Sequence, residues 1–156
     1  NRLTVWTNVM TGDLGVLPPW MGLAGYFPRA SIDRAKVHLE RVGLADKANS
    51  RADKLSGGQQ QRVGIARTLT QEPRLILADE PVSSLDPVSA KTIMDLLREI
   101  NQKNGVSIIC NLHLPDLARA YAQRLLVLRD GKIVFDGVPK QMDSSRLEAL
   151  YESPLQ

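Results

Sequence analysis

The sequence predicts an α/β fold, in which short apolar strands alternate with amphipathic helices. Two apolar runs of strand length, residues 75–78 and 106–112, are separated by a helical pattern that starts at Asp86-Pro87. This strand-helix-strand order favours parallel pairing of two buried strands. The pair Asp130-Gly131 has strand-forming residues on both sides, which is typical of a hairpin, so we expect the sheet to gain an antiparallel edge.

The part of the chain that precedes the first strand contains a predicted loop and two predicted helices. Gly, Pro and aromatic residues crowd residues 13–30, a composition that favours a long loop. We expect a helix that Ser31 caps and that Gly43 ends. A second helix should begin at residues 56–58 and end before Pro73. Its apolar spacing places three residues toward the core: Val63, Ala66 and Leu69.

The helices that follow are predicted from the same spacing rule. The helix after Asp86-Pro87 should bury Ile93, Leu96, Leu97 and Ile100. A helix containing Leu117 and Tyr121 precedes the hairpin, and the tail after Pro139 suggests a last amphipathic helix with Leu147 and Leu150 on one face.

Composition limits the class of protein. With 156 residues, 43% hydrophobic and 24% charged, the chain can bury one ordinary core, which excludes a disordered or fibrous protein. Its apolar runs are far shorter than the roughly 18 residues that cross a bilayer. The single cysteine, Cys110, excludes an internal disulfide and is expected to act as a small core residue in a reducing compartment. No secretory signal and no starting Met are visible, so we expect the natural N-terminus to be missing.

The net charge of +3 is modest, and the basic residues are interleaved with acidic ones instead of forming a stripe. This pattern argues against binding to nucleic acid and is typical of a solvated surface.

The run LSGGQQQR at residues 55–62 carries the first candidate site. Two glycines at the start of a helix let the backbone approach a ligand, and the N–H groups there attract anions such as phosphate. Ser56 adds a hydroxyl and Gln59 an amide at the rim. An ordinary glycine-rich cap is the alternative for Gly57 and Gly58 alone, but the whole octapeptide favours the phosphate site.

Asp79 and Glu80 carry the second candidate site, because they follow a strand at its carboxyl end, where ligands bind in open α/β folds. Consecutive strand residues point in opposite directions, so one acid can hold Mg²⁺ through water while its neighbour faces an attacking water. The alternative is a charged pair that marks the end of the strand.

Three further polar residues have weaker local support. His113 closes the second strand at the analogous position, which favours a functional role over a structural one. Asp86 can cap a helix and can also touch the nucleotide site of a partner subunit. His38 lies on a predicted helix among charged residues and is expected to be solvated.

Together these residues resemble the ATPase subunit of an ABC transporter. Residues 55–59 resemble the signature motif, residues 75–80 the Walker B strand with its catalytic glutamate, residues 84–86 the D-loop, and His113 the switch histidine. The four motifs stand in the family's order, and the resemblance covers essentially the whole chain. Several stretches are in addition similar to phosphonate importer ATPases: residues 59–62, residues 77–82, and residues 111–113 together with 116–118.

The resemblance implies the C-terminal part of an ABC ATPase nucleotide-binding domain, with a P-loop NTPase-like sheet and a helical subdomain. Residues 1–72 would form the helical subdomain with the signature motif. Residues 73–156 would form part of the RecA-like core, with the Walker B strand, the D-loop, the switch histidine, the hairpin and the last helix.

The same resemblance implies ATP and Mg²⁺ as cofactors and gives each site residue a role. Glu80 would be the base or the group that orients the attacking water, Asp79 the Mg²⁺-associated acid, and His113 a γ-phosphate contact. In a head-to-tail homodimer, Ser56, Gly57 and Gly58 would clamp the γ-phosphate bound by the partner subunit, and Gln59 and Asp86 would also lie at that nucleotide site.

The implied partners are transmembrane permease subunits and, indirectly, a periplasmic or extracellular substrate-binding protein. The subunit would sit peripherally on the cytoplasmic face of the inner membrane. Trp20, Tyr26 and Phe27 would lie near the permease, although packing on their own subdomain is an equal alternative.

Three parts of the family's pattern do not occur in the sequence: the strand with the adenine-stacking aromatic, the phosphate-binding Gly-x-x-x-x-Gly-Lys-Ser/Thr loop and the glutamine-bearing Q-loop. Asn1 therefore corresponds to a position just after the Q-loop, and we expect the chain alone to be inactive and to leave apolar sheet surface uncovered.

Two other functions stay open. A soluble ABC ATPase acting on DNA or ribosomes would carry coiled coils or a second cassette, and the sequence shows neither. The other alternative is a noncatalytic domain that donates only the signature half-site to another subunit. The presence of Glu80 and His113 argues against it.

Overall fold

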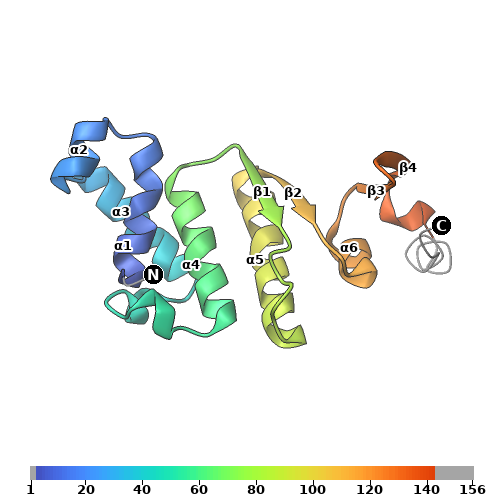
Figure 1. The fold of residues 1–156 in the computed structure, drawn as a ribbon, viewed down its shortest axis with the longest axis horizontal. Helices are drawn as coiled ribbons and strands as arrows, with labels where there is room; N and C mark the ends of the chain where they lie inside the picture. Colours follow the sequence, from blue (N-terminus) through green and yellow to red (C-terminus); the bar gives the residue numbers. More distant parts are fainter. Residues whose placement is uncertain (1–2, 143–156) are drawn as a thin grey trace. The chain divides into compact units, whose positions relative to one another are not determined.

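The computed structural model describes residues 3–142 of the chain. Figure 1 shows the elements, whose bounds are as follows: α1 Val5–Met10, η1 Thr11–Gly15, α2 Pro19–Ala24, α3 Arg29–Arg41, η2 Ala45–Lys47, η3 Ala52–Lys54, α4 Gly57–Thr70, β1 Leu75–Asp79, α5 Pro87–Asn104, β2 Ser107–Asn111, α6 Pro115–Tyr121, β3 Leu125–Arg129, β4 Lys132–Gly137 and η4 Pro139–Gln141.

The chain divides into two compact units, Asn1–Cys110 and Asn111–Gln156. The functional division between residues 72 and 73 stays a prediction, because compactness alone does not test it. Among residues 3–142, no helix combines the length and the apolar character that crossing a bilayer requires.

In the first unit, α1 and α3 pack against α4. The apolar residues that share one face of each helix lie buried between the three helices. The connection after α3 packs over these apolar residues. Val5 and Trp6 donate backbone hydrogen bonds to the carbonyls of Ser50 and Ala48, at 2.9 Å each. The core is formed by Val5, Val9, Met10, Ala35, Leu39, Val42, Leu44, Val63, Ala66 and Leu69, together with residues from β1 and α5 and with Val106, just before β2.

The prediction of a long loop over residues 13–30 is wrong, because this segment contains the end of η1 and the whole of α2. Pro19 occupies the first turn of α2, where its fixed φ fits a helix and its missing N–H costs nothing. Gly25 ends α2 in the left-handed conformation, with φ of 66°. Proline and glycine therefore mark the two ends of a short helix in a segment whose composition indicated a loop.

The third helix begins earlier than predicted. Pro28 is the residue before α3, and Ser31 lies inside the helix and is buried, so its predicted role as the cap is wrong. The competing signal is Pro28, whose φ is already set for a chain entering a helix. The predicted end is confirmed, since Gly43 follows the helix with φ of 67°.

The fourth helix is confirmed at both ends and on its buried face. Ser56 is the N-cap of α4, which ends at Thr70, three residues before Pro73. Its buried residues include the three predicted ones, Val63, Ala66 and Leu69.

The strand-helix-strand unit is also confirmed. Asp86 caps α5, and all four predicted inward residues of that helix are buried. β1 and β2 pair in a two-stranded sheet. The N–H of Ser107 donates to the carbonyl of Arg74 at 3.0 Å, which joins the beginnings of the two strands, and their arrows run the same general way in Figure 1.

The expectation that both strands are buried is wrong for one face of this sheet. Ile76 and Ile108 belong to or pack against the core, whereas Leu77 is 72% and Ile109 61% exposed. Because strand side chains alternate, Leu77 and Ile109 share the face opposite to the core. Cys110 points to the core side and is half-buried, which raises the pKa of its thiol to about 11.

In the second unit, β3 and β4 form the predicted hairpin. Arg129 pairs with Lys132 across the turn, where Asp130 and Gly131 have φ of 50° and 72° as a two-residue primed turn requires. The hairpin is its own two-stranded sheet, so the prediction that it extends the first sheet is wrong for the strands described. Of the predicted last helix, Leu147 and Leu150 lie outside the described residues.

Candidate functional site

The glycine-rich turn at the start of α4 is closed by a reciprocal capping box. The backbone N–H of Ser56 donates to Oε1 of Gln59 at 3.0 Å, and the N–H of Gln59 donates to Oγ of Ser56 at 3.4 Å. The N–H groups of Gly57 and Gly58 come before Gln60, whose N–H makes the first hydrogen bond within the helix, to the carbonyl of Ser56, so they face out from the positive end of the helix. The carbonyl of the Gln59 side chain therefore serves the cap, a role that the Ser-x-x-Gln spacing is typical of and that our sequence analysis did not assign.

This turn packs against the start of α5. A Cβ placed on Gly57 would lie 3.3 Å from Cδ2 of Leu85, and one on Gly58 would lie 3.2 Å from Cβ of Ser89. A small cavity of about 60 Å³ remains beside the contact, lined by Ser56, Gly58, Gln59, Arg62, Ser89, Thr92 and Ile93. The structure thus brings the predicted signature motif together with the predicted D-loop in one chain.

The two predicted carboxylates lie where the strand ends. Asp79 is the last residue of β1 and is exposed, on the same side of the strand as Leu77. Glu80 has φ of 45°, in the left-handed region, and its carbonyl accepts a hydrogen bond from the N–H of Ser83 at 3.2 Å. Pro81 and Val82 are buried, and the chain turns at these residues. The opposite orientation of the two acids stays a prediction, because the turn at Glu80 ends the strand alternation.

Asp86 is the N-cap of α5, which confirms the structural part of its predicted role. One carboxylate oxygen accepts from the N–H groups of Val88 at 3.0 Å and Ser89 at 2.9 Å. Hydrogen bonds from the side chain and backbone of Ser89, and then from the backbone of Val88, hold the pKa of Asp86 below its ordinary value. Its contact with the nucleotide of a partner subunit stays a prediction.

His113 belongs to the second unit and is exposed, shortly before α6 begins at Pro115. Its predicted approach to the phosphate site therefore stays a prediction. His38 differs from expectation, because it is half-buried on α3 and its Nδ1 is buried without a hydrogen-bond partner. Desolvation, and next the charge of Arg41, lower the pKa of His38.

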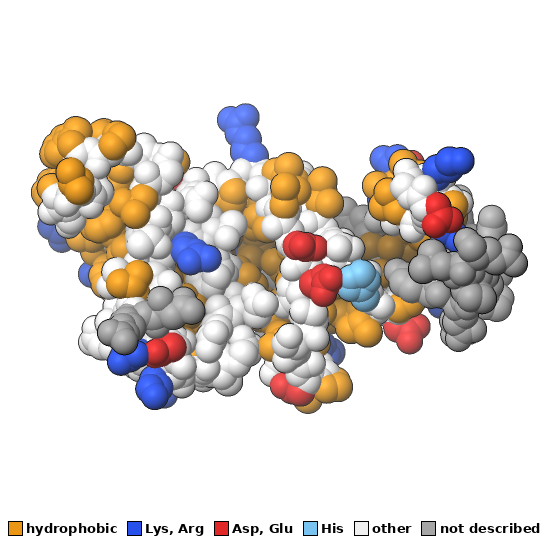
Figure 2. Space-filling view, in the orientation of Figure 1, with side chains coloured by type: hydrophobic (Ala, Val, Ile, Leu, Met, Phe, Trp, Pro, Cys, Tyr) orange, Lys and Arg blue, Asp and Glu red, His pale blue; other side chains and the backbone are white. Residues whose placement is uncertain are grey.

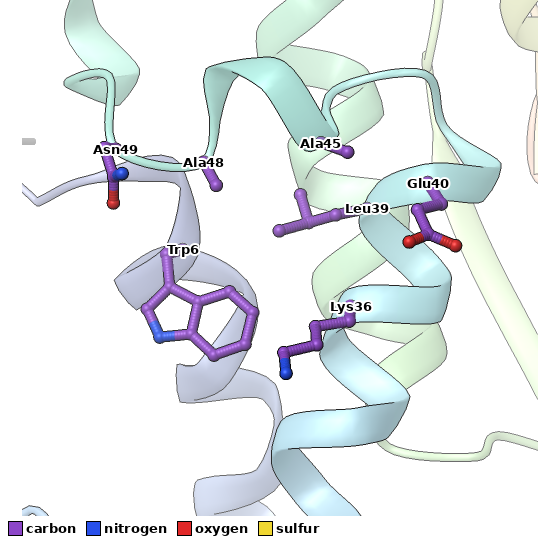
Figure 3. A pocket seen from close by; sticks show the side chains of 7 residues that line it. All are labelled: Trp6, Lys36, Leu39, Glu40, Ala45, Ala48 and Asn49. Atoms are coloured by element: carbon purple, nitrogen blue, oxygen red, sulfur yellow. The ribbon is translucent and has the colours of Figure 1, made fainter.

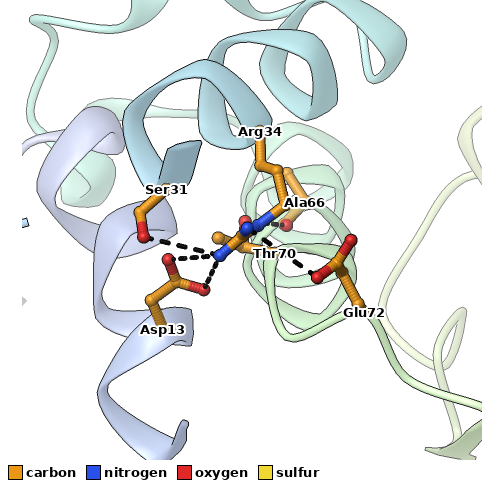
Figure 4. Close-up of polar contacts among 6 residues, drawn as sticks. All are labelled: Asp13, Ser31, Arg34, Ala66, Thr70 and Glu72. Carbon is orange, nitrogen blue, oxygen red and sulfur yellow. Dashed lines mark hydrogen bonds and ion pairs between the residues drawn. The ribbon is translucent and has the colours of Figure 1, made fainter. Parts of the chain in front are cut away.

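A buried ion pair lies close to His38, and sequence reasoning missed it. Asp13 is 0% exposed, and Nη2 of Arg34 donates to its two carboxylate oxygens at 3.0 and 3.2 Å. Figure 4 shows the guanidinium of Arg34 lying between Asp13, Ser31 and Glu72. No local pattern predicts this pair, since the two residues are 21 positions apart and Asp13 fell in a predicted loop.

A second cavity lies away from these motifs. It has a volume of about 310 Å³ and lies between α1, α3 and the connection after α3. In Figure 3, Trp6 and Lys36 face each other across it, over an apolar floor that includes Leu39. Its lining residues are Trp6, Lys36, Leu39, Glu40, Ala45, Ala48 and Asn49.

Within residues 3–142, no three His, Cys, Asp or Glu side chains group in a way that would hold a metal ion. Mg²⁺ does not need such a group, because it keeps several waters and binds one or two carboxylates together with substrate phosphates. The exposed carboxylate of Asp79 at a strand end fits that mode of binding.

Comparison with solved structures supports the fold. A chain of an inward-facing metal-chelate type ABC transporter superimposes with a TM-score of 0.87 at 27% identity, and the match covers 99% of this chain and 60% of that one. The ATP-binding cassette MJ0796, a dimer bound to ADP and phosphate after hydrolysis, superimposes with a TM-score of 0.70 at 32% identity, covering 88% of this chain and 57% of that one.

Curated relatives are similar over almost the whole chain. The phosphonates import ATP-binding protein PhnC of Thiobacillus denitrificans is 53% identical over 152 residues, and the match covers 97% of this chain and 58% of that protein. PhnC of Staphylococcus saprophyticus is 48% identical over 155 residues, covering 99% of this chain and 60% of that protein.

The chain therefore spans about 60% of the length of the relatives it matches, as part of an α/β ABC ATPase cassette. Residues 1–83 match the model of the ABC transporter family. With this match over more than half of its 156 residues, the chain belongs to the ABC transporter family, as an ATP-binding protein similar to PhnC.

Proposed function

We propose that this chain is part of the ATP-binding subunit of an ABC importer, with a phosphonate as the transported substrate. The observation that carries the proposal is the capped glycine turn, packed against the turn that follows Asp79 and Glu80. The 53% identity to a phosphonates import ATP-binding protein supports the substrate class.

In this proposal the phosphate of ATP meets the outward N–H groups of Gly57 and Gly58 at the positive end of α4. Ser56 and Gln59 fix that end of the helix through the capping box. Asp79 holds Mg²⁺ through water, and the bound ion neutralises charge that develops on the phosphates. Glu80 orients the attacking water and accepts its proton, while His113 contacts the γ-phosphate.

The glycine turn meets a phosphate bound by a second copy of the subunit. Dimer formation is supported by the dimeric cassette MJ0796. In such an arrangement Asp86, which already caps α5, lies in the turn next to the glycines and contacts the site of the partner.

A permease is the proposed partner of the apolar surface on α2. Figure 2 shows hydrophobic side chains gathered over this helix, and Trp20 is 62% and Tyr26 58% exposed. Phe27 instead packs against the protein's own core. The subunit would then sit peripherally on the cytoplasmic face of the membrane, with a substrate-binding protein acting on the other side.

The proposal is tested in a chimera that joins this chain to the parts of the Thiobacillus denitrificans relative that it does not match. Release of phosphate from Mg-ATP by the chimera is expected, and Glu80→Gln should lower kcat by roughly a hundredfold or more with little change in KM. The matched control is Glu72→Gln, which removes the same charge from another residue with positive φ. Equal activity of the two variants would contradict the role of Glu80.

The 156-residue chain alone is expected to release almost no phosphate from Mg-ATP. Phosphoryl transfer depends on positioning and on charge stabilisation, and the printed sequence has no phosphate-binding loop with its lysine. A malachite-green assay measures this directly. Turnover by the chain that disappears in Glu80→Gln would show that the sequence contains a complete site.

A further inference from the structure

We infer that Ser89 is a positioning residue. It holds the glycine turn at the start of α4 (residues 56–58) against the carboxylate turn, which is the segment of residues 79–86 from the end of β1 to the start of α5. The inference concerns how the chain holds the N–H groups of Gly57 and Gly58. What those groups bind rests on the proposed function.

The first step is the closeness of the two turns. A Cβ on Gly58 would stand 3.2 Å from Cβ and 3.3 Å from Oγ of Ser89, closer than side chains normally approach. One on Gly57 would stand 3.3 Å from Cδ2 of Leu85. Glycine at these positions therefore has a packing reason inside the chain, in addition to any contact with a phosphate.

The second step is that Ser89 is held rigidly at the start of α5. Ser89 lies in the first turn of an 18-residue helix, and its N–H donates to the capping carboxylate of Asp86 at 2.9 Å. Ser89 therefore has little freedom to yield to a larger neighbour at Gly58, and the contact transmits the position of one turn to the other.

The third step is the connection along the chain. Asp86 follows Asp79 and Glu80 after a short turn in which Val82 is buried and the N–H of Leu85 donates to the carbonyl of Val82 at 3.2 Å. The contact at Ser89 thus links the glycine N–H groups to the end of β1 through a fixed cap. A shift in the position of the carboxylate turn would therefore also move the glycine turn of the same subunit.

The first experiment measures the order of the glycine N–H groups in the 156-residue chain by ¹⁵N relaxation. In the unsubstituted chain, Gly57 and Gly58 should have order parameters of about 0.85, and Ser89→Gly should lower them below about 0.6. Ser89→Ala keeps the Cβ contact and should retain most of the order. Thr92→Gly is the matched control, since it places a glycine in the same helix and cavity without touching Gly58.

The second experiment is a rescue measured as the urea midpoint of unfolding. Alanine is a better helix former than glycine, so Gly58→Ala should stabilise α4 unless the new methyl group meets Ser89. We expect Gly58→Ala to lower the midpoint in the unsubstituted chain and to raise it on the Ser89→Gly background. Gly64→Ala, whose Cβ would meet nothing within 4 Å, should raise the midpoint in both backgrounds.

Two results would overturn the inference: unchanged order parameters in Ser89→Gly, or the same midpoint shift for Gly58→Ala in both backgrounds. Neither experiment uses a nucleotide. A failure here therefore leaves the proposed ATPase function untouched, and an inactive chimera leaves this inference untouched.

Discussion

Glu80 stands out at the scale of single residues, because it has a left-handed backbone at the end of β1. A non-glycine residue in this region costs on the order of 1–2 kcal/mol. Asp130, which also has positive φ, is explained by the hairpin turn and by the tolerance of Asp for that region. Glu72 and Glu80 have neither explanation, and of these two only Glu80 lies in the candidate site, where a functional constraint on its side chain would account for the strain.

Asn tolerates the left-handed region better than Glu, so Glu80→Asn should raise the free energy of unfolding by about 0.5–1 kcal/mol. Glu72→Asn is the matched comparison, because Glu72 has φ of 50° outside the candidate site. Urea denaturation of the two variants measures both effects. A loss of stability in Glu80→Asn alone would mean that contacts of the Glu80 side chain outweigh the backbone strain.

His38 predicts a dependence of stability on pH. Burial and Arg41 lower its pKa in the folded chain from 6.5, the ordinary value that the unfolded chain keeps. Below pH 6.5, His38 binds a proton in the unfolded chain more readily than in the folded chain. The free energy of unfolding should therefore fall as the pH falls through 6.5. Urea denaturation between about pH 7.5 and 5.5 measures the slope.

His38→Gln should flatten this slope. His113→Gln should leave it in place, since His113 is exposed in the other unit. An equally steep slope in His38→Gln would show that His38 is not the cause of the pH dependence.

At the scale of elements, the sequence predicted those parts whose signals are local. Asp86 is predicted as a cap because a side-chain oxygen next to a helix start accepts from the backbone N–H groups of that start, and the structure confirms it. The hairpin followed from Asp130-Gly131 for a similarly local reason. For the candidate site, the motifs located the two turns, but only the three-dimensional structure shows that Ser89 joins them.

The failures have physical causes of longer range. The ion pair of Asp13 and Arg34 links segments far apart in the chain, so no spacing rule detects it. The burial of His38 depends on the packing of α3 against these segments. The apolar residues Leu77 and Ile109 predicted burial on both sheet faces, yet only one face meets other elements among residues 3–142.

The close approach of η1 to α4 gives a sharp prediction for one element. A Cβ on Gly12 would lie 2.2 Å from the backbone carbonyl oxygen of Arg67, which cannot rotate away. Gly12→Ala should therefore lower the free energy of unfolding by about 1–3 kcal/mol. Gly64→Ala, in open space on α4, should instead gain up to about 1 kcal/mol from helix propensity. Thermal unfolding followed by circular dichroism compares the two, and equal shifts would contradict the predicted overlap.

At the scale of the whole molecule, one face of the first sheet is left uncovered by residues 3–142. Parallel strands in α/β folds are normally covered on both faces. Here Ile76 and Ile108 meet the core, while Leu77 and Ile109 on the opposite face are exposed. Because the relatives are longer, about 60% of their length being matched, we expect an uncovered sheet face to be a property of the 156-residue chain and not of those proteins.

This exposed face predicts self-association of the 156-residue chain. Two large apolar side chains that protrude from adjacent strands, Leu77 and Ile109, bury area when two copies meet, and the hydrophobic gain is non-directional. Sedimentation velocity should therefore show species larger than the monomer at about 10–100 μM, a range in which exposed apolar surface commonly drives association. The double variant Leu77→Lys, Ile109→Lys should remain monomeric, because two like charges on that face repel a second copy. Val88→Lys, which removes an equally exposed apolar residue from α5, should associate as the unsubstituted chain does. If the double variant associates like the unsubstituted chain, the contact lies elsewhere, with the apolar surface of α2 as the next surface to alter.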